Sequence, residues 1–143
     1  ATMLCSDYGK DVALKADAPN GYAVYSPHGQ FAGLRPKTLI LASAYSSSSR
    51  YTLGDMDFSV LVKLTSGTCY LKLPTSPQDG QEYHIESWGA TVNITASQSV
   101  FSLYSGSTTS AGTAITQAGR ALLRFKFYKD ANQWSVAWMN RNN

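Results

Sequence analysis

The segment from Leu71 to Ile94 constrains the fold of this chain more than any other part of it. Its sequence is LKLPTSPQDGQEYHIESWGATVNI, in which apolar and polar residues alternate on either side of two turn signals. Pro74 to Gly80 is the first signal, because proline cannot donate to a strand ladder and Asp-Gly favours a tight reversal. Trp88-Gly89 is the second, and we expect it to turn the chain again. The segment therefore predicts a strand–turn–strand–turn–strand meander. It contains no nucleophile elbow, phosphate loop or metal-ligand spacing, which indicates a module that binds or assembles.

Further strand patterns fill the chain from residue 37 onward. They comprise Thr38–Tyr45, Phe58–Leu64, Thr68–Leu73, weaker segments at Val100–Leu103 and Ala114–Thr116, and a closing pair, Leu123–Tyr128 and Trp134–Trp138, joined by a reversal at Asp130–Asn132. About eight strands at roughly 8 to 12 residue spacing, with no amphipathic helical pattern, predict an all-β domain of the β-sandwich or jelly-roll kind. The alternation predicts a core made of Phe58, Val60, Val62, Leu71, Leu73, Ile85, Val92, Ile94, Leu123, Phe125, Phe127, Trp134 and Val136.

Residues 1–36 have a different character. Short extended pieces such as Val12–Ala16 and Tyr22–Tyr25 alternate with turn signals at Ala18–Gly21 and Ser26–Gly29. Strands this short bury too little surface alone, so we expect the segment to pack on the rest of the domain or on identical copies. We divide the chain into a neck segment, 1–36, and a β-sandwich receptor-binding or cap domain, 37–143. In a trimer the neck would bury apolar side chains between chains, namely Val12, Leu14, Val24, Phe31 and Leu34.

Charge and composition weaken several classes of function. The formal charge of +3 comes from 12 basic and 9 acidic residues that are spread along the chain, so nucleic-acid binding has little support. No apolar run approaches the roughly 20 residues of a membrane span, and we expect no membrane insertion. The two cysteines, Cys5 and Cys69, do not make a disulfide framework, and Cys69 has the pattern of a small buried apolar residue.

Candidate catalytic residues each have a plainer explanation. Glu82, His84 and Glu86 share one face of an expected strand, where they could place a metal or an acid/base pair or could form a solvated polar face. Asp55 and Asp57 could pair as carboxylates, but they directly precede a strand, where acidic residues commonly end a turn. We therefore expect no catalytic residue, no metal site and no cofactor, and we expect that the chain is not an enzyme.

Two loops and one tryptophan are the best candidates for recognition. The two loops are Tyr45–Tyr51, which includes Arg50, and Tyr104–Ser110. Both combine tyrosine with small hydroxylated residues, and this mixture gives rigid aromatic contact and adaptable hydrogen bonding. Trp88 stands next to Gly89, and an exposed indole can stack on a sugar ring or contact another subunit. The loops could also be ordinary soluble connections. The receptor-binding candidates are Tyr45, Arg50, Tyr51, Trp88 and Tyr104.

Together these motifs resemble a known family. The chain resembles the carboxy-terminal domains of bacteriophage tail fibres and tailspikes. The resemblance rests on the run LPTSPQDGQEYHI, a glycine turn, a V-x-I strand and a closing aromatic hairpin ending in NQWSV. The leader GYAVYSPHGQFAGLRP is similar to the neck segments that precede such domains, so the resemblance covers most of the chain from Gly21 onward. The chain has no His-x-His pair of the kind that coordinates iron in some fibre tips, and it has no self-cleaving chaperone motif.

The resemblance implies a homotrimeric virion tail appendage. Such an appendage is assembled in the bacterial cytoplasm, acts outside the cell and binds a bacterial surface glycan or outer-membrane protein. Two alternatives stay open. The chain could be a purely structural trimerisation or cap module, or it could be a monomeric carbohydrate-binding module of a secreted protein.

Overall fold

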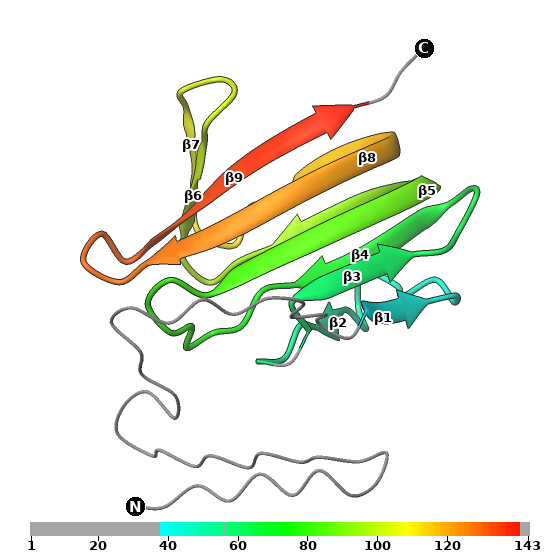
Figure 1. The fold of residues 1–143 in the computed structure, drawn as a ribbon, viewed down its shortest axis with the longest axis horizontal. Helices are drawn as coiled ribbons and strands as arrows, with labels where there is room; N and C mark the ends of the chain where they lie inside the picture. The colour runs from blue at the N-terminus through cyan, green and yellow to red at the C-terminus, as the bar shows by residue number, and fades with distance from the viewer. Residues whose placement is uncertain (1–37, 56, 141–143) are drawn as a thin grey trace, which may run out of the picture. The chain divides into compact units, whose positions relative to one another are not determined.

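The computed structural model describes residues 38–55 and 57–140, which fall within one compact unit of the chain. The expected neck segment, 1–36, lies outside the described residues, as does Cys5. No helix occurs in the described part, so the expected all-β fold is confirmed (Figure 1). Its strands are β1 (Thr38–Leu41), β2 (Tyr51–Thr52), β3 (Ser59–Val62), β4 (Thr68–Lys72), β5 (Glu82–Thr95), β6 (Ser99–Ser102), β7 (Thr108–Thr109), β8 (Ile115–Tyr128) and β9 (Gln133–Asn140).

All the strands join in one mixed sheet. The main order is β1-β3-β5-β8-β9-β6-β7, with β4 on β5 and β2 on β4. The 14-residue strands β5 and β8 form its centre and run antiparallel, with β9 beside β8 (Figure 1). Along its other edge β5 is paired first with β3 and then with β4, both parallel to it. β1 pairs in parallel with β3, and β2 pairs in parallel with β4. This side of the sheet therefore consists of parallel strands.

The expected meander is wrong in its pairing. β4 does not form a hairpin with the segment that follows it but lies parallel to Thr91–Thr95, while His84–Ser87 pairs with β3. The expected turn at Trp88-Gly89 is also wrong, because β5 runs through it without a break. A bulge between Gly89 and Val92 explains the error. An extra residue moves the buried positions from odd to even numbers, and in the sequence that change of phase looks like the start of a new strand.

The turn residues have the expected geometry, whereas the bounds of two expected strands differ from the structure. Gly67 and Gly80 have positive φ angles of 79° and 73°, as their turns require, and Asn132 at 45° sits in the reversal before β9. The two segments expected at Ala114–Thr116 and Leu123–Tyr128 belong to a single strand, β8. The strand expected over Thr38–Tyr45 ends at Leu41.

One face of the sheet carries the core. Every expected core residue except Phe58 is buried, and the cluster also includes Leu53, Cys69 and Tyr83. The ring of Trp134 on β9 lies 5.8 Å from that of Tyr83 on β5, although β8 separates the two strands. On this face, side chains from strands that are not direct neighbours therefore pack against each other. This packing gives the domain a sandwich-like core.

Phe58 corrects the expected core list. Its side chain is 37% exposed, and its ring lies 4.6 Å from that of His84 on the outward face. The residue precedes β3, which begins at Ser59, so the strand's alternation does not extend to it.

Candidate binding groove

An open groove of about 1140 Å³ lies near the bulge in β5. Its walls come from the β3–β4 connection, the middle of β5, the segment after β6, the middle of β8 and the end of β9. Two of the expected binding residues, Trp88 and Tyr104, line it together, although they are 16 positions apart in sequence and the end of β5 and all of β6 lie between them. The fold therefore brings the second candidate loop and the candidate tryptophan to one place.

Aromatic and apolar side chains form much of the groove surface. Tyr104 is 80% exposed, and its ring lies 5.6 Å from that of the half-buried Trp138 on β9. Trp88 is 45% exposed, and Leu122 and Met139 also line the groove with much of their surface in solvent. Exposed apolar surface gathered in this way is typical of an interaction site.

Trp88 is held by two neighbours on the outward face of the sheet. Its indole Nε1 donates a hydrogen bond to Glu86 Oε1 at 3.1 Å. The ammonium of Lys63 lies 5.8 Å from the indole centroid, within range of a cation–π contact. Because the indole N–H already has an acceptor, what Trp88 offers a ligand is ring surface.

Arg120 is the one cationic residue in the described lining of the groove. It lies directly opposite Trp88 in the β5–β8 ladder, and its side chain is exposed. Arg124, four residues further along the same face of β8, donates to Glu82 at 3.1 Å. Within residues 38–55 and 57–140, Arg120 has no such side-chain hydrogen bond or ion pair.

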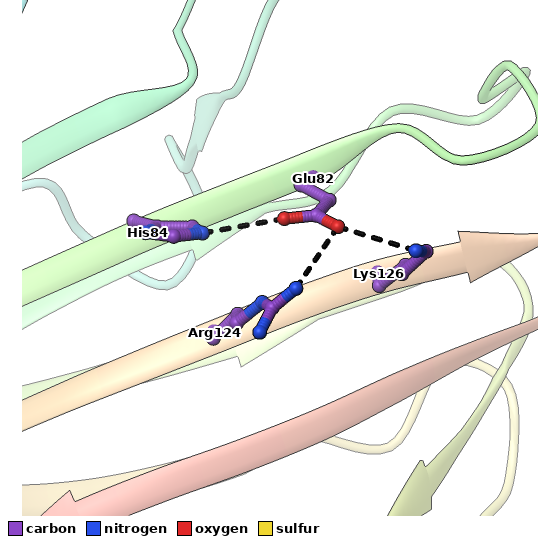
Figure 2. A network of polar contacts seen from close by, with 4 residues as sticks. All are labelled: Glu82, His84, Arg124 and Lys126. Carbon is purple, nitrogen blue, oxygen red and sulfur yellow. Dashed lines mark hydrogen bonds and ion pairs between the residues drawn. The ribbon is translucent and has the colours of Figure 1, made fainter.

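The polar face next to the groove is built around Glu82, as Figure 2 shows. Its carboxylate lies 3.1 Å from Arg124, 3.4 Å from Lys126 and 3.4 Å from His84. Partial burial alone would raise the pKa of Glu82, but the hydrogen bonds and charge of Arg124, with those from His84 and Lys126, hold its pKa below the ordinary value. Glu82 and His84 therefore belong to a cross-strand ion-pair cluster, and Glu86 is instead bonded to Trp88. No group of three or more potential metal ligands occurs among the residues that the structure describes.

The other three candidate residues lie outside the groove lining and make internal contacts. Arg50 donates to the backbone oxygens of Leu71 and Asn93, at 3.2 and 3.1 Å. The rings of Tyr45 and Tyr51 lie 5.3 Å apart. Burial, together with the bond that Tyr51 donates to Asp57 at 3.1 Å, raises the pKa of Tyr51. Their part in recognition remains a prediction from the loop composition.

Gly54 and Asp57 are bonded to each other next to the buried Tyr83. Asp57 accepts a hydrogen bond from the Gly54 amide at 2.8 Å, while the buried Tyr83 hydroxyl donates to the Gly54 carbonyl at 3.1 Å. Burial, followed by the charges of Asp55 and Asp57, raises the pKa of Tyr83 far above its ordinary value. These contacts give Asp57 a structural role, and Asp55 accepts a hydrogen bond from Gln81 Nε2 at 3.2 Å.

Sequence reasoning missed part of the groove. Trp138 packs against the core, and its ring also lies 5.6 Å from that of Tyr104 at the groove. Leu122 and Met139 were not singled out. A signal for Leu122 existed, since it is an apolar residue on the β8 face that otherwise carries Arg120, Arg124 and Lys126.

Cys69 is buried and forms no disulfide with any described residue, and burial raises the pKa of its thiol. In the same part of the chain, no helix has the length and apolar character needed to cross a membrane. No family model, curated protein or solved structure matches the chain.

Proposed function

We propose that this chain is a non-catalytic binding module that holds a bacterial surface glycan in the groove, as the tip domain of a phage tail fibre or tailspike. One observation carries the proposal: the exposed rings of Trp88 and Tyr104, with Trp138 behind Tyr104, converge on one groove. Aromatic faces stack on the apolar faces of sugar rings, and nearby polar groups then bind the hydroxyls. Glu86, Gln117 and Arg120 supply such groups here.

A trimer would make weak single sites effective. The resemblance to tail fibres implies three copies on one virion appendage, each presenting the same groove. Simultaneous contact with a repetitive cell surface raises the apparent affinity by about 10²–10⁴ without any new contact. The groove needs to bind only weakly in each copy.

A purely structural trimerisation or cap module is the second candidate, and one row of the sheet favours it. On the outward face, one row of the ladder crosses five strands. Four of the strands carry an apolar residue in this row, and β5 carries Glu86. This outer row consists of Ile40, Leu61, Leu122 and Met139, of which Ile40 is 56% and Met139 is 67% exposed. Contact between copies through the outer row would remove this apolar surface from water.

Attachment to host cells tests the binding role. The full chain carrying Trp88→Ala or Tyr104→Ala should attach at least tenfold less strongly than the unmodified chain, because each change removes one stacking surface. Leu103→Ala and Tyr128→Ala are matched controls: both residues are exposed, at 60% and 46%, and neither lines the groove. Mass and melting temperature are measured for every variant.

The outcomes separate the two candidates. Reduced attachment with unchanged mass and melting temperature supports the glycan groove. Full attachment by both groove variants removes it, and lost attachment that follows lost assembly assigns these residues to subunit contact.

A further inference from the structure

We propose that the sugar bound in the groove carries an anionic group and that Arg120 binds this group while Trp88 stacks on the ring. This inference deepens the proposed function and rests on it. It starts from the ladder register, which places Arg120 directly opposite Trp88 on neighbouring strands. Side chains in such pairs have Cβ atoms about 4.5–5.5 Å apart, so one monosaccharide can touch both.

Arg120 differs from the other cations on its face of β8. Arg124 and Lys126 both contact the carboxylate of Glu82, at 3.1 and 3.4 Å, so each already has an anionic partner within the fold (Figure 2). Arg120 has no such partner among the described side chains, and it lines the groove together with the aromatic rings. An exposed guanidinium beside an open ring surface is suited to an external anion.

The local charge balance also favours an anion. Lys63 stands beside the Trp88 ring and Arg120 lines the groove, whereas Glu86 is the one carboxylate among the described lining residues. Glu86 is turned toward Trp88, where Oε1 accepts the indole proton at 3.1 Å. Two cations against one carboxylate leave a net positive charge around Trp88, which attracts an anion and repels a further cation.

The chemistry of the guanidinium sets the ligand class. Its planar array of donors matches a carboxylate or a phosphate in a bidentate contact, and such charge-assisted bonds are about twice as strong as neutral ones. The shared chemistry is therefore an acidic sugar, whose anion is a carboxylate or a phosphate on the ring that stacks against Trp88.

Three monosaccharides with the same ring test this inference. Glucose, glucuronate and glucose 6-phosphate differ at one carbon and are neutral, carboxylated and phosphorylated. Each is titrated into the full chain while the indole N–H signals of its three tryptophans are followed by NMR. A Trp88→Phe variant identifies the Trp88 signal. We expect one or both anionic sugars to bind about tenfold more tightly than glucose, with the advantage falling as salt is added. The stronger of the two anions identifies the acidic group.

Arg120→Gln should remove the advantage of the anionic sugars over glucose, with the anionic affinities of each variant compared with that variant's own glucose affinity. Arg124→Gln is the matched control, an arginine on the same strand and face that is bonded to Glu82, and it should preserve the advantage. Equal affinities for the three sugars, or an advantage that survives in Arg120→Gln, would overturn the anionic inference while leaving a neutral glycan in the groove. Failure of all three sugars to perturb the Trp88 signal also overturns it. The proposed function itself stands or falls on cell attachment by Trp88→Ala and Tyr104→Ala.

Discussion

A side chain on Gly89 would collide with the backbone of Thr65. A Cβ built there lies 2.7 Å from the Thr65 carbonyl oxygen, closer than real contacts allow. The two segments are joined on either side of this point, because the Ala90 amide donates to Leu64 and the Thr91 amide donates to Gly67, at 3.0 and 2.8 Å. The β3–β4 connection therefore rests on the bulge of β5, and Thr65, part of that connection, lines the groove.

This contact predicts the effect of Gly89→Ala. The new methyl group has to displace backbone, which is less adaptable than the end of a side chain, so we expect a loss of about 1–3 kcal/mol in the free energy of unfolding. Urea denaturation measures it. Gly106→Ala is the comparison, since its φ of 66° is unfavourable for alanine but nothing lies within 4 Å of the added Cβ. If Gly89→Ala costs no more than Gly106→Ala, the close approach of Thr65 does not constrain the fold.

Between elements, β5 and β8 are joined by charge as well as by backbone hydrogen bonds. Glu82 on β5 lies opposite Lys126 on β8 and also contacts Arg124 two residues earlier. Its side chain is 19% exposed, so the cluster is less screened than a free surface pair. His84 adds a third contact from the same strand as Glu82.

The cluster predicts a defined pH dependence. The folded-state pKa of Glu82 lies below its ordinary value of 4.5, so the ion pairs stabilise the fold above that value. This stabilisation is lost as the pH falls through the folded-state pKa. At pH 7 we expect Glu82→Gln to lower the free energy of unfolding by about 1 kcal/mol, and the difference from the unmodified chain should disappear in acid.

A double-mutant cycle isolates the contribution of the ion pair. Glu82→Gln and Arg124→Gln are measured singly and together by urea denaturation across this pH range. Coupling between the two positions should be present at neutral pH and absent in acid. Coupling of equal size at both ends would show that charge on Glu82 is not its source.

At the scale of the whole molecule, the outer row and the groove compete for the same surface. Leu122 and Met139 belong to both, whereas Ile40 lies at the β1 edge and does not line the groove. If three copies assemble through another part of the chain, the outer row stays free and the groove stays open. If they assemble through the outer row, Leu122 and Met139 are covered.

Light scattering of the full chain distinguishes these arrangements. We expect a particle with the mass of three chains, as the proposed fibre tip requires, and we expect Ile40→Lys to leave that mass unchanged. Dissociation of the Ile40→Lys variant would place the outer row between subunits and favour the structural cap. A monomeric unmodified chain would instead favour a carbohydrate-binding module of a secreted protein.

The sequence alone determined the class of fold and most of the buried face. A strand shows alternate residues to opposite faces, so the pattern around Leu123, Phe125 and Phe127 predicted their burial without knowledge of any partner strand. The turns at Gly67, Gly80 and Asn132 were predictable for the same local reason, since each needs a residue that tolerates a positive φ. Trp88 and Tyr104 were both expected to be exposed, but Trp88 is exposed because it lies on the outward face of β5 and not because the chain turns there.

Only the tertiary structure decided which strands pair and therefore where the groove lies. Parallel pairing of β4 with the second half of β5, and the bulge at Gly89 that permits it, depend on segments about twenty residues apart meeting in one register. The same applies to Arg120 opposite Trp88 and to Tyr104 against Trp138. Alternation states which side of a strand faces the core. It carries no information about the neighbouring strand, because the choice of partner depends on closing long loops and on packing the whole apolar face at once.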